Sequence, residues 1–104
     1  MAHHCIIATV TAAKKKLSTR DMSRITKALA DPRRFGILKR IAQAPSIACS
    51  DLRDAFPVSA PTLSHHLKEL ETAGLIEAVK RGKYLDVTFQ RDLWTAYVEE
   101  LGRL

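Results

Sequence analysis

The segment from Ser59 to Phe89, SAPTLSHHLKELETAGLIEAVKRGKYLDVTF, decides the fold of this chain. Its first half carries leucines at the spacing of a helix that buries one face, namely Leu63, Leu67 and Leu70. Ser59 is a favourable N-cap for this helix, and Gly74 is suited to closing it. We therefore predict a helix over residues 59–73.

The second half of the segment changes to a period of two, which is typical of a strand. Apolar Leu85, Val87 and Phe89 alternate with Tyr84, Asp86 and Thr88. Residues 75–80 are its predicted partner, and Gly82 supplies the residue that a tight hairpin turn needs. The hairpin tip, at residues 79–84, is a basic wing whose cations suit DNA phosphates, namely Lys80, Arg81 and Lys83.

Two helices are predicted before this segment. Ser18, followed three residues later by Asp21, opens an amphipathic helix that stops at Asp31-Pro32. Asp31 and Pro32 also begin the next helix, which ends before Pro45. We expect its core-facing side chains to be Phe35, Leu38 and Ile41.

A short helix from Cys49 to Phe56 precedes the helix at 59–73, and this pair is a helix-turn-helix pattern whose second helix can lie in a DNA major groove. A last helix is predicted within residues 91–104. Its apolar stripe is too wide for the small core, so we expect a second subunit to bury it; the stripe contains Leu93, Trp94, Tyr97, Val98 and Leu101.

These elements predict a mainly α protein with a small β-hairpin (α+β), a winged helix-turn-helix of about five helices and a two-stranded wing. Residues 1–20 form an N-terminal arm, and residues 21–104 form the DNA-binding and dimerisation domain. A chain of 104 residues is one domain and excludes a large multidomain enzyme. The formal charge of +6 favours an acidic partner such as nucleic acid.

Cysteine usage and hydropathy indicate a cytoplasmic protein. Cys5 and Cys49 form no C-x-x-C pair and no disulfide framework. The longest apolar stretch is far below the roughly 20 residues that span a bilayer, so no membrane partner is expected. We expect no enzyme such as a nuclease, because the acidic residues are scattered rather than gathered with His in one constellation.

Four runs of sequence resemble the ArsR/SmtB family of bacterial winged-helix repressors: LADPRRFGIL at 29–38, SAPTLSHHLKEL at 59–70, AGLI at 73–76 and KRGK at 80–83. The resemblance covers roughly residues 20–101. It implies a homodimeric transcriptional repressor that binds double-stranded operator DNA and that a metal ion or another signal releases.

The resemblance also implies roles for particular residues. It places Ser59, Thr62, Ser64 and His65 on the exposed face of the recognition helix, while Lys68 and the wing cations would bind phosphates. His65 stands where many members have Arg, which predicts altered or weaker base readout. We expect His66 to pack or to hydrogen-bond structurally. The implied dimer interface on the first and last helices is Met22, Ile25, Leu29, Leu93, Trp94, Tyr97 and Leu101.

The family's two best-known sensor patterns do not fit. The sequence ACSDL at 48–52 has no thiolate in register with Cys-Val-Cys-Asp-Leu, and residues 91–104 contain no His. A third pattern joins a cysteine of the arm to one on the third helix, as Cys5 and Cys49 would. These thiolates would select arsenite, zinc or cadmium, and His3 and His4 beside Cys5 would complete a zinc-like ligand set. A thiol-reactive signal and an inert buried Cys49 are the alternatives.

One further function is compatible with the fold: a winged-helix protein-interaction module without sequence-specific DNA binding. Such a module would have a less basic wing and apolar residues on the outer face of 59–70. The polar residues at those positions favour DNA, for example Ser64, His65 and Lys68.

Overall fold

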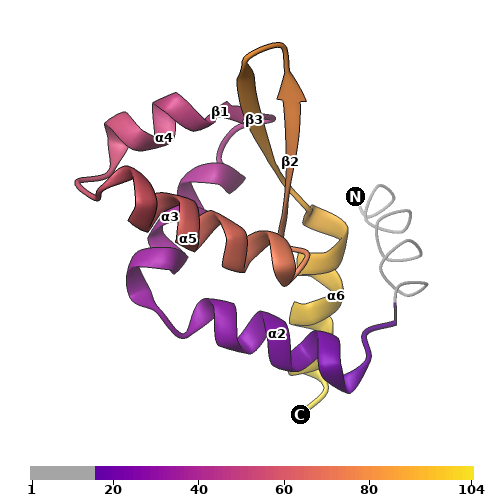
Figure 1. Ribbon diagram of the computed structural model, residues 1–104. Helices are drawn as coiled ribbons and strands as arrows, with labels where there is room; N and C mark the ends of the chain where they lie inside the picture. Colours follow the sequence, from indigo (N-terminus) through magenta and orange to yellow (C-terminus); the bar gives the residue numbers. More distant parts are fainter. Residues whose placement is uncertain (1–15) are drawn as a thin grey trace.

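The computed structural model describes residues 16–104. In this part of the chain, helices surround one end of a small antiparallel sheet whose hairpin projects from the body (Figure 1). The elements are α2 (Thr19–Leu29), α3 (Pro32–Ala42), β1 (Ile47–Ala48), α4 (Cys49–Ala55), α5 (Ala60–Thr72), β2 (Ile76–Arg81), β3 (Tyr84–Phe89) and α6 (Arg91–Gly102). The predicted winged helix-turn-helix is confirmed.

The first two helices begin where their capping residues predict. Ser18 Oγ accepts from Asp21 N at 3.1 Å, and the Asp21 carboxylate accepts from Ser18 N at 3.1 Å, which completes a capping box. Asp31 Oδ1 accepts from Arg33 N at 2.8 Å at the start of α3. Because α2 starts at Thr19, residues 19 and 20 belong to a helix and not to the predicted arm.

The core lies where the helices meet the base of the sheet. Its largest fully buried side chains come from four helices, from β3 and from the turn before β2, namely Ile25, Ile37, Ile41, Leu52, Leu63, Leu70, Leu75 and Val87.

The buried face of α3 differs from the predicted one at one position, where the prediction is wrong. Phe35 is 39% exposed, and Ile37 lies in the core in its place. The buried stripe of α3 is Ile37, Leu38 and Ile41.

The sheet has three strands in the order β1-β3-β2, one more than the predicted wing. β1 pairs with β3 through Ile47 opposite Val87 and Ala48 opposite Asp86. A strand of two residues is too short to show a period, so the sequence pattern does not predict it. The hairpin itself is confirmed: Arg81 pairs with Tyr84 across a turn in which Gly82 has φ +64°.

Helix α6 closes the structure against α2. The Tyr97 hydroxyl lies 2.9 Å from Thr26 Oγ1, and the Trp94 ring is 6.0 Å from the Tyr97 ring and 6.2 Å from that of Phe89. Tyr97 is therefore 5% exposed and buried within its own chain, so no second subunit is needed to cover it. None of the helices within residues 16–104 has the length and apolar character needed to cross a bilayer.

Candidate nucleic-acid interface

The orientation of α5 follows from its cap and its buried face. Ser59 Oγ accepts from Thr62 N at 3.3 Å, which starts the helix, and donates to Thr62 Oγ1 at 2.9 Å. The buried side chains of α5 are Leu63, His66, Leu67 and Leu70. Because these hold one side of the helix in the core, the opposite side faces solvent.

The solvent face of α5 contains the residues that the sequence predicts for it. Ser59, Ser64, His65 and Lys68 are exposed, whereas Thr62 is half-buried. Ser59 and Thr62 bond to each other, so their hydroxyls are partly committed to the cap. Ser64, His65 and Lys68 remain as the side chains free to meet a major groove.

The wing presents its cations on two faces. Successive strand residues point to opposite sides, so Lys80, paired with Leu85, lies on the face opposite Arg81. Lys80, Arg81 and Lys83 are all exposed. The tip therefore carries positive charge on both sides of the hairpin, and such cations suit DNA phosphates.

Arg81 is held in place by two neighbours for which the sequence predicts no functional role. Its Nε lies 2.6 Å from Asp86 Oδ2 and its Nη2 lies 3.3 Å from Asp86 Oδ1, a two-point pair across the strands. This hydrogen bond holds the pKa of Asp86 below its usual value. The guanidinium carbon also lies 5.6 Å from the centre of the Tyr84 ring, and Lys83 Nζ lies 5.8 Å from it.

The register of the hairpin is the feature from which the Arg81–Asp86 pair could have been predicted. With a two-residue turn, Arg81 lies opposite Tyr84, and Asp86 lies on the same face two residues further along β3. The side chain of Arg81 is still 65% exposed. It is thus oriented by Asp86 and Tyr84 while its outer edge remains accessible.

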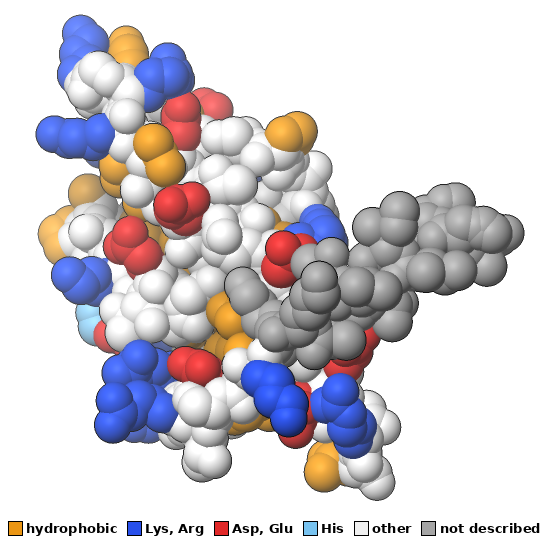
Figure 2. Space-filling view, turned by 90° about the vertical axis from the view of Figure 1, so that its right-hand side faces the viewer, with side chains coloured by type: hydrophobic (Ala, Val, Ile, Leu, Met, Phe, Trp, Pro, Cys, Tyr) orange, Lys and Arg blue, Asp and Glu red, His pale blue; other side chains and the backbone are white. Residues whose placement is uncertain are grey.

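One edge of the molecule collects much of this charge. In Figure 2, Lys and Arg side chains stand at the tip of the wing, and further Lys, Arg and His side chains follow below it along the same edge. The wing tip and the solvent face of α5 are the described elements that supply the predicted DNA contacts. Together they form a surface that is positive at its end and polar in its middle.

His66 differs from its neighbour His65 by being buried. It is 5% exposed, and its Nδ1 accepts a hydrogen bond of 3.3 Å from Arg34 Nε. This confirms the predicted structural role of His66. Burial lowers the pKa of His66, and the positive charges of Arg34, His65 and Arg33 act in the same direction, while Asp31 opposes them.

The predicted sensor residues are only partly within the described chain. Cys5, His3 and His4 lie outside it, so a pairing of Cys5 with Cys49 is untested. Cys49 is half-buried at the start of α4 and borders a hollow of about 350 Å³ between α4, α5 and the sheet. Within residues 16–104 there is no group of three or more His, Cys, Asp and Glu that could hold a metal.

The predicted dimer residues divide into three groups by exposure. Ile25 and Tyr97 are 0% and 5% exposed within one chain, so they have almost no surface left to give to a partner, and we remove them from the predicted interface. Met22, Leu29, Leu93 and Trp94 are half-buried against the core. Leu101 is 45% exposed, as is the neighbouring Val98 at 46%.

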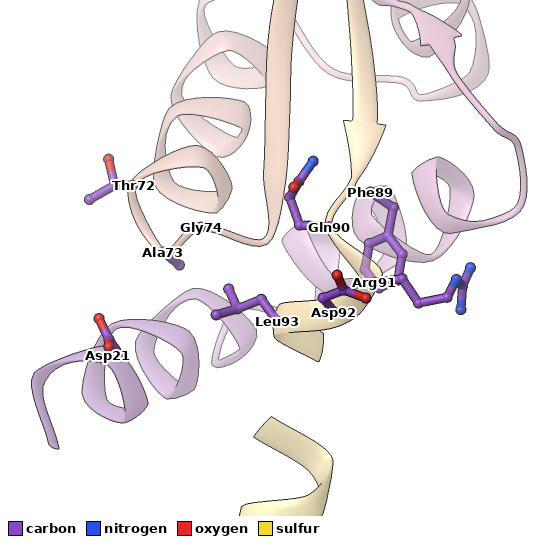
Figure 3. Close-up of a pocket in the computed structure, with 9 residues that line it drawn as sticks. All are labelled: Asp21, Thr72, Ala73, Gly74, Phe89, Gln90, Arg91, Asp92 and Leu93. Atoms are coloured by element: carbon purple, nitrogen blue, oxygen red, sulfur yellow. The ribbon is translucent and has the colours of Figure 1, made fainter. Parts of the chain in front are cut away.

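A second hollow, of about 530 Å³, lies at the C-terminal end of α5. Figure 3 shows its lining from the α5–β2 turn, the end of β3 and the first turn of α6, with Asp21 of α2 across from them. Two carboxylates, Asp21 and Asp92, face it together with Arg91. This mixed lining does not favour a phosphate, and the hollow contains none of the predicted DNA-binding residues.

The arrangement of α4, α5 and the β2–β3 wing defines a winged helix-turn-helix protein. A helix-turn-helix domain family matches residues 29–79. The arsenical resistance operon repressor of Staphylococcus xylosus is 41% identical over 66 residues, which are 64% of this chain and 62% of that protein. The cadmium resistance transcriptional regulatory protein CadC of Listeria innocua is 29% identical over 96 residues, 89% of this chain and 80% of that protein.

Solved structures agree with this assignment. The ArsR-like transcriptional regulator from Rhodococcus sp. RHA1 has a TM-score of 0.73 and 27% identity, covering 81% of this chain and 78% of that chain. The homodimeric winged helix-turn-helix DNA-binding domain of a possible ArsR-family regulator from Mycobacterium bovis has a TM-score of 0.66 and 28% identity, covering 84% and 88%. The chain belongs to the ArsR/SmtB family of winged-helix transcriptional regulators.

Proposed function

We propose that this protein is a homodimeric transcriptional repressor that binds operator DNA in the cytoplasm. The chain spans 62% of the length of the arsenical resistance repressor that it matches. The observation that carries it is the surface of α5 and the wing: Ser64, His65 and Lys68 are exposed on α5, and Ser64 and Lys68 line one hollow together with Ala78 and Leu85 of the hairpin. In this function α5 enters the major groove and the wing binds the flanking phosphates.

The alternative function, a protein-interaction module, is less favoured because the exposed surface of α5 is polar. A protein-binding face is enriched in aromatic and apolar residues at its centre. The exposed residues of α5 are instead mostly small, polar or charged, for example Ser64, His65 and Lys68. Such a surface suits a hydrated, negatively charged partner.

Salt dependence of DNA binding tests the proposal. Binding of the protein to a duplex from the region upstream of its own gene is measured by fluorescence anisotropy at several salt concentrations. Removing the wing cations Arg81 and Lys83 by alanine substitution should weaken binding to all sequences and reduce the salt slope by roughly 1 for each phosphate that is no longer neutralised. An unchanged slope would remove the wing from the interface.

A matched control lies on α3. Lys39 is exposed and lies 6.0 Å from the Phe35 ring, in a hollow that Trp94 also lines, so Lys39→Ala removes one positive charge away from α5 and the wing. Its salt slope should equal that of the wild type. If Lys39→Ala lowers the slope as much as a wing substitution, the effect is one of net charge and not of the proposed surface.

The signal that releases the DNA is a separate part of the proposal. The relatives named for arsenical and cadmium resistance make arsenite, cadmium and zinc the first ligands to test. The described residues around Cys49 do not fit a metal, because they include Arg53 and Lys68 and no second soft ligand. A metal site would therefore require residues from 1–15, such as Cys5.

Adding arsenite, zinc or cadmium to the protein–DNA complex tests that requirement. Release from wild-type protein that is abolished in both Cys5→Ser and Cys49→Ser would establish a shared thiolate site. Release by peroxide alone would instead indicate a thiol-reactive signal. If the complex persists with every reagent, neither cysteine is a sensor.

A further inference from the structure

Arg34 connects three elements from a nearly buried position. Its side chain is 12% exposed and lies at the first turn of α3. One terminal nitrogen, Nη1, donates to the carbonyl oxygens of Lys27 at 3.4 Å and Ala28 at 3.3 Å, at the end of α2. The other, Nη2, lies 4.0 Å from Asp31 Oδ2, the N-cap of α3.

The third guanidinium nitrogen of Arg34 reaches α5. Nε points to Nδ1 of His66 at 3.3 Å, so the guanidinium joins the end of α2, the start of α3 and the middle of the recognition helix. An arginine Nε–H can only donate a hydrogen bond. Nδ1 of His66 must therefore be unprotonated, and the neutral ring carries its proton on Nε2.

We propose that Arg34 and His66 are positioning residues for DNA binding: their hydrogen bond sets α5 against α2 and α3, and protonation of His66 releases it. The inference rests on the proposed function, since it concerns how α5 is presented to DNA. His66 faces the core while the preceding His65 faces solvent. A shift of the His66 anchor thus moves the adjacent residue that is predicted to read a base.

Most of the charged groups around His66 favour the neutral form of its ring. Arg33 and Arg34 on α3 and His65 on α5 oppose a positive charge on the ring, and only Asp31 favours it. Arg34, which bonds to the ring, also donates to the backbone carbonyls of Lys27 and Ala28 on α2. A protonated His66 would place an N–H against the Arg34 donor, so the two cations would separate.

The sign of the pH effect follows from the direction of the shift. The pKa of His66 in the folded chain is lowered, with burial as the largest cause. The free ring has a pKa of about 6.5, so the bond is intact above that value and is lost as the pH falls through the lower, folded-state pKa. DNA affinity should decline in the same window.

The decisive experiment compares wild-type protein with His66→Asn between pH 5 and pH 8, using the upstream duplex at constant salt. Asn places an acceptor oxygen near the position of Nδ1 and cannot be protonated. At pH 8 the two proteins should bind within about threefold of each other. As the pH falls below about 6.5 and through the lower folded-state pKa of His66, the wild-type affinity should fall more steeply, by up to about one log unit per pH unit for each protomer.

Other histidines do not confuse this comparison. His3, His4 and His65 are present in both proteins, so the two proteins differ only at position 66. Identical profiles for wild type and His66→Asn would overturn the inference. Arg34→Lys supplies the second variant: Lys cannot satisfy the two carbonyls and His66 together, so affinity at pH 8 should fall about tenfold. Unchanged affinity would also overturn it.

A DNA-free measurement separates this inference from the proposed function. Nitrogen NMR of the wild-type protein should show the neutral His66 ring with its proton on Nε2, and the Arg34 Nε–H signal should disappear as His66 titrates. A persistent Arg34 signal would contradict the inference even if the chain binds DNA. Failure of the wild type to bind the duplex at pH 8 would contradict the repressor function while leaving the NMR result to judge the bond.

Discussion

Gly74 is the residue at which the turn from α5 into β2 depends on the absence of a side chain. Its φ is +83°, a region that side-chain-bearing residues avoid. A Cβ at this position would also lie 3.0 Å from Cδ2 of Leu93 at the start of α6. The labelled side chains of Figure 3 show Leu93 beside this turn. The position therefore combines backbone strain with a close contact.

Gly74→Ala should lower the free energy of unfolding by about 1–2 kcal/mol from the backbone alone, and by more where Leu93 cannot move. Urea titration followed by circular dichroism measures the change. Gly82→Ala is the matched control, because Gly82 also has a positive φ of +64° but a Cβ added there would meet no atom within 4 Å. Equal destabilisation of the two variants would show that the contact with Leu93 contributes nothing.

At the scale of elements, the helix caps determine where α2 and α3 begin and couple them to pH. The backbone N–H of Arg34 and then that of Arg33 hold the pKa of Asp31 below its usual value, and Ser18 does the same for Asp21. A lowered carboxylate pKa gives stability that is present above the unfolded value, about 3.9, and lost as the pH falls through the folded-state value. Both caps should therefore weaken in acid.

Asp31→Asn tests the contribution of one cap. Asn accepts the same backbone hydrogen bonds and does not titrate. We expect the melting temperature of the variant to change less between about pH 5 and pH 3 than that of the wild type, and thermal melts at each pH would measure this. Parallel curves would mean that Asp31 plays no part in the acid response and that other carboxylates, such as Asp21 and Asp86, carry it.

At the scale of the whole molecule, α6 both completes the core and leaves an apolar strip outside it. Its inner side chains contact α2 and the end of β3, whereas Val98 and Leu101 are 46% and 45% exposed. These two residues lie three apart and thus on one side of the helix. A second copy of α6 related by twofold symmetry would cover both strips at once.

Leu101→Glu should convert the proposed dimer to monomer. Burial of a leucine at an interface stabilises the dimer by about 2–5 kcal/mol, and in a symmetric dimer the substitution removes this contribution from both subunits. Analytical ultracentrifugation at micromolar concentration measures the state directly. Val79→Thr is the control, since Val79 is 49% exposed on the wing, away from α6, and should leave the dimer intact. A wild-type protein that sediments as a monomer contradicts the dimer itself.

Much of the architecture is predictable because it depends on short-range signals. The caps at Ser18, Asp31 and Ser59 and the leucine spacing of α5 place the helices within a residue or two of their observed bounds. The alternation from Tyr84 to Phe89 predicts the strand of the wing. Each of these signals involves residues a few positions apart, so chain neighbours alone determine it.

Tertiary packing decided what local patterns could not. Phe35 and Ile37 are both apolar residues of α3, and only the position of the neighbouring helices selects Ile37 for the core. Tyr97 is expected at a subunit interface, yet Thr26, 71 positions earlier, bonds to it within the chain. Likewise the bond from Arg34 to His66 joins residues 32 positions apart, and no period in the sequence indicates it. Contacts between distant residues arise only when the helices pack, because burial and hydrogen bonding act through space.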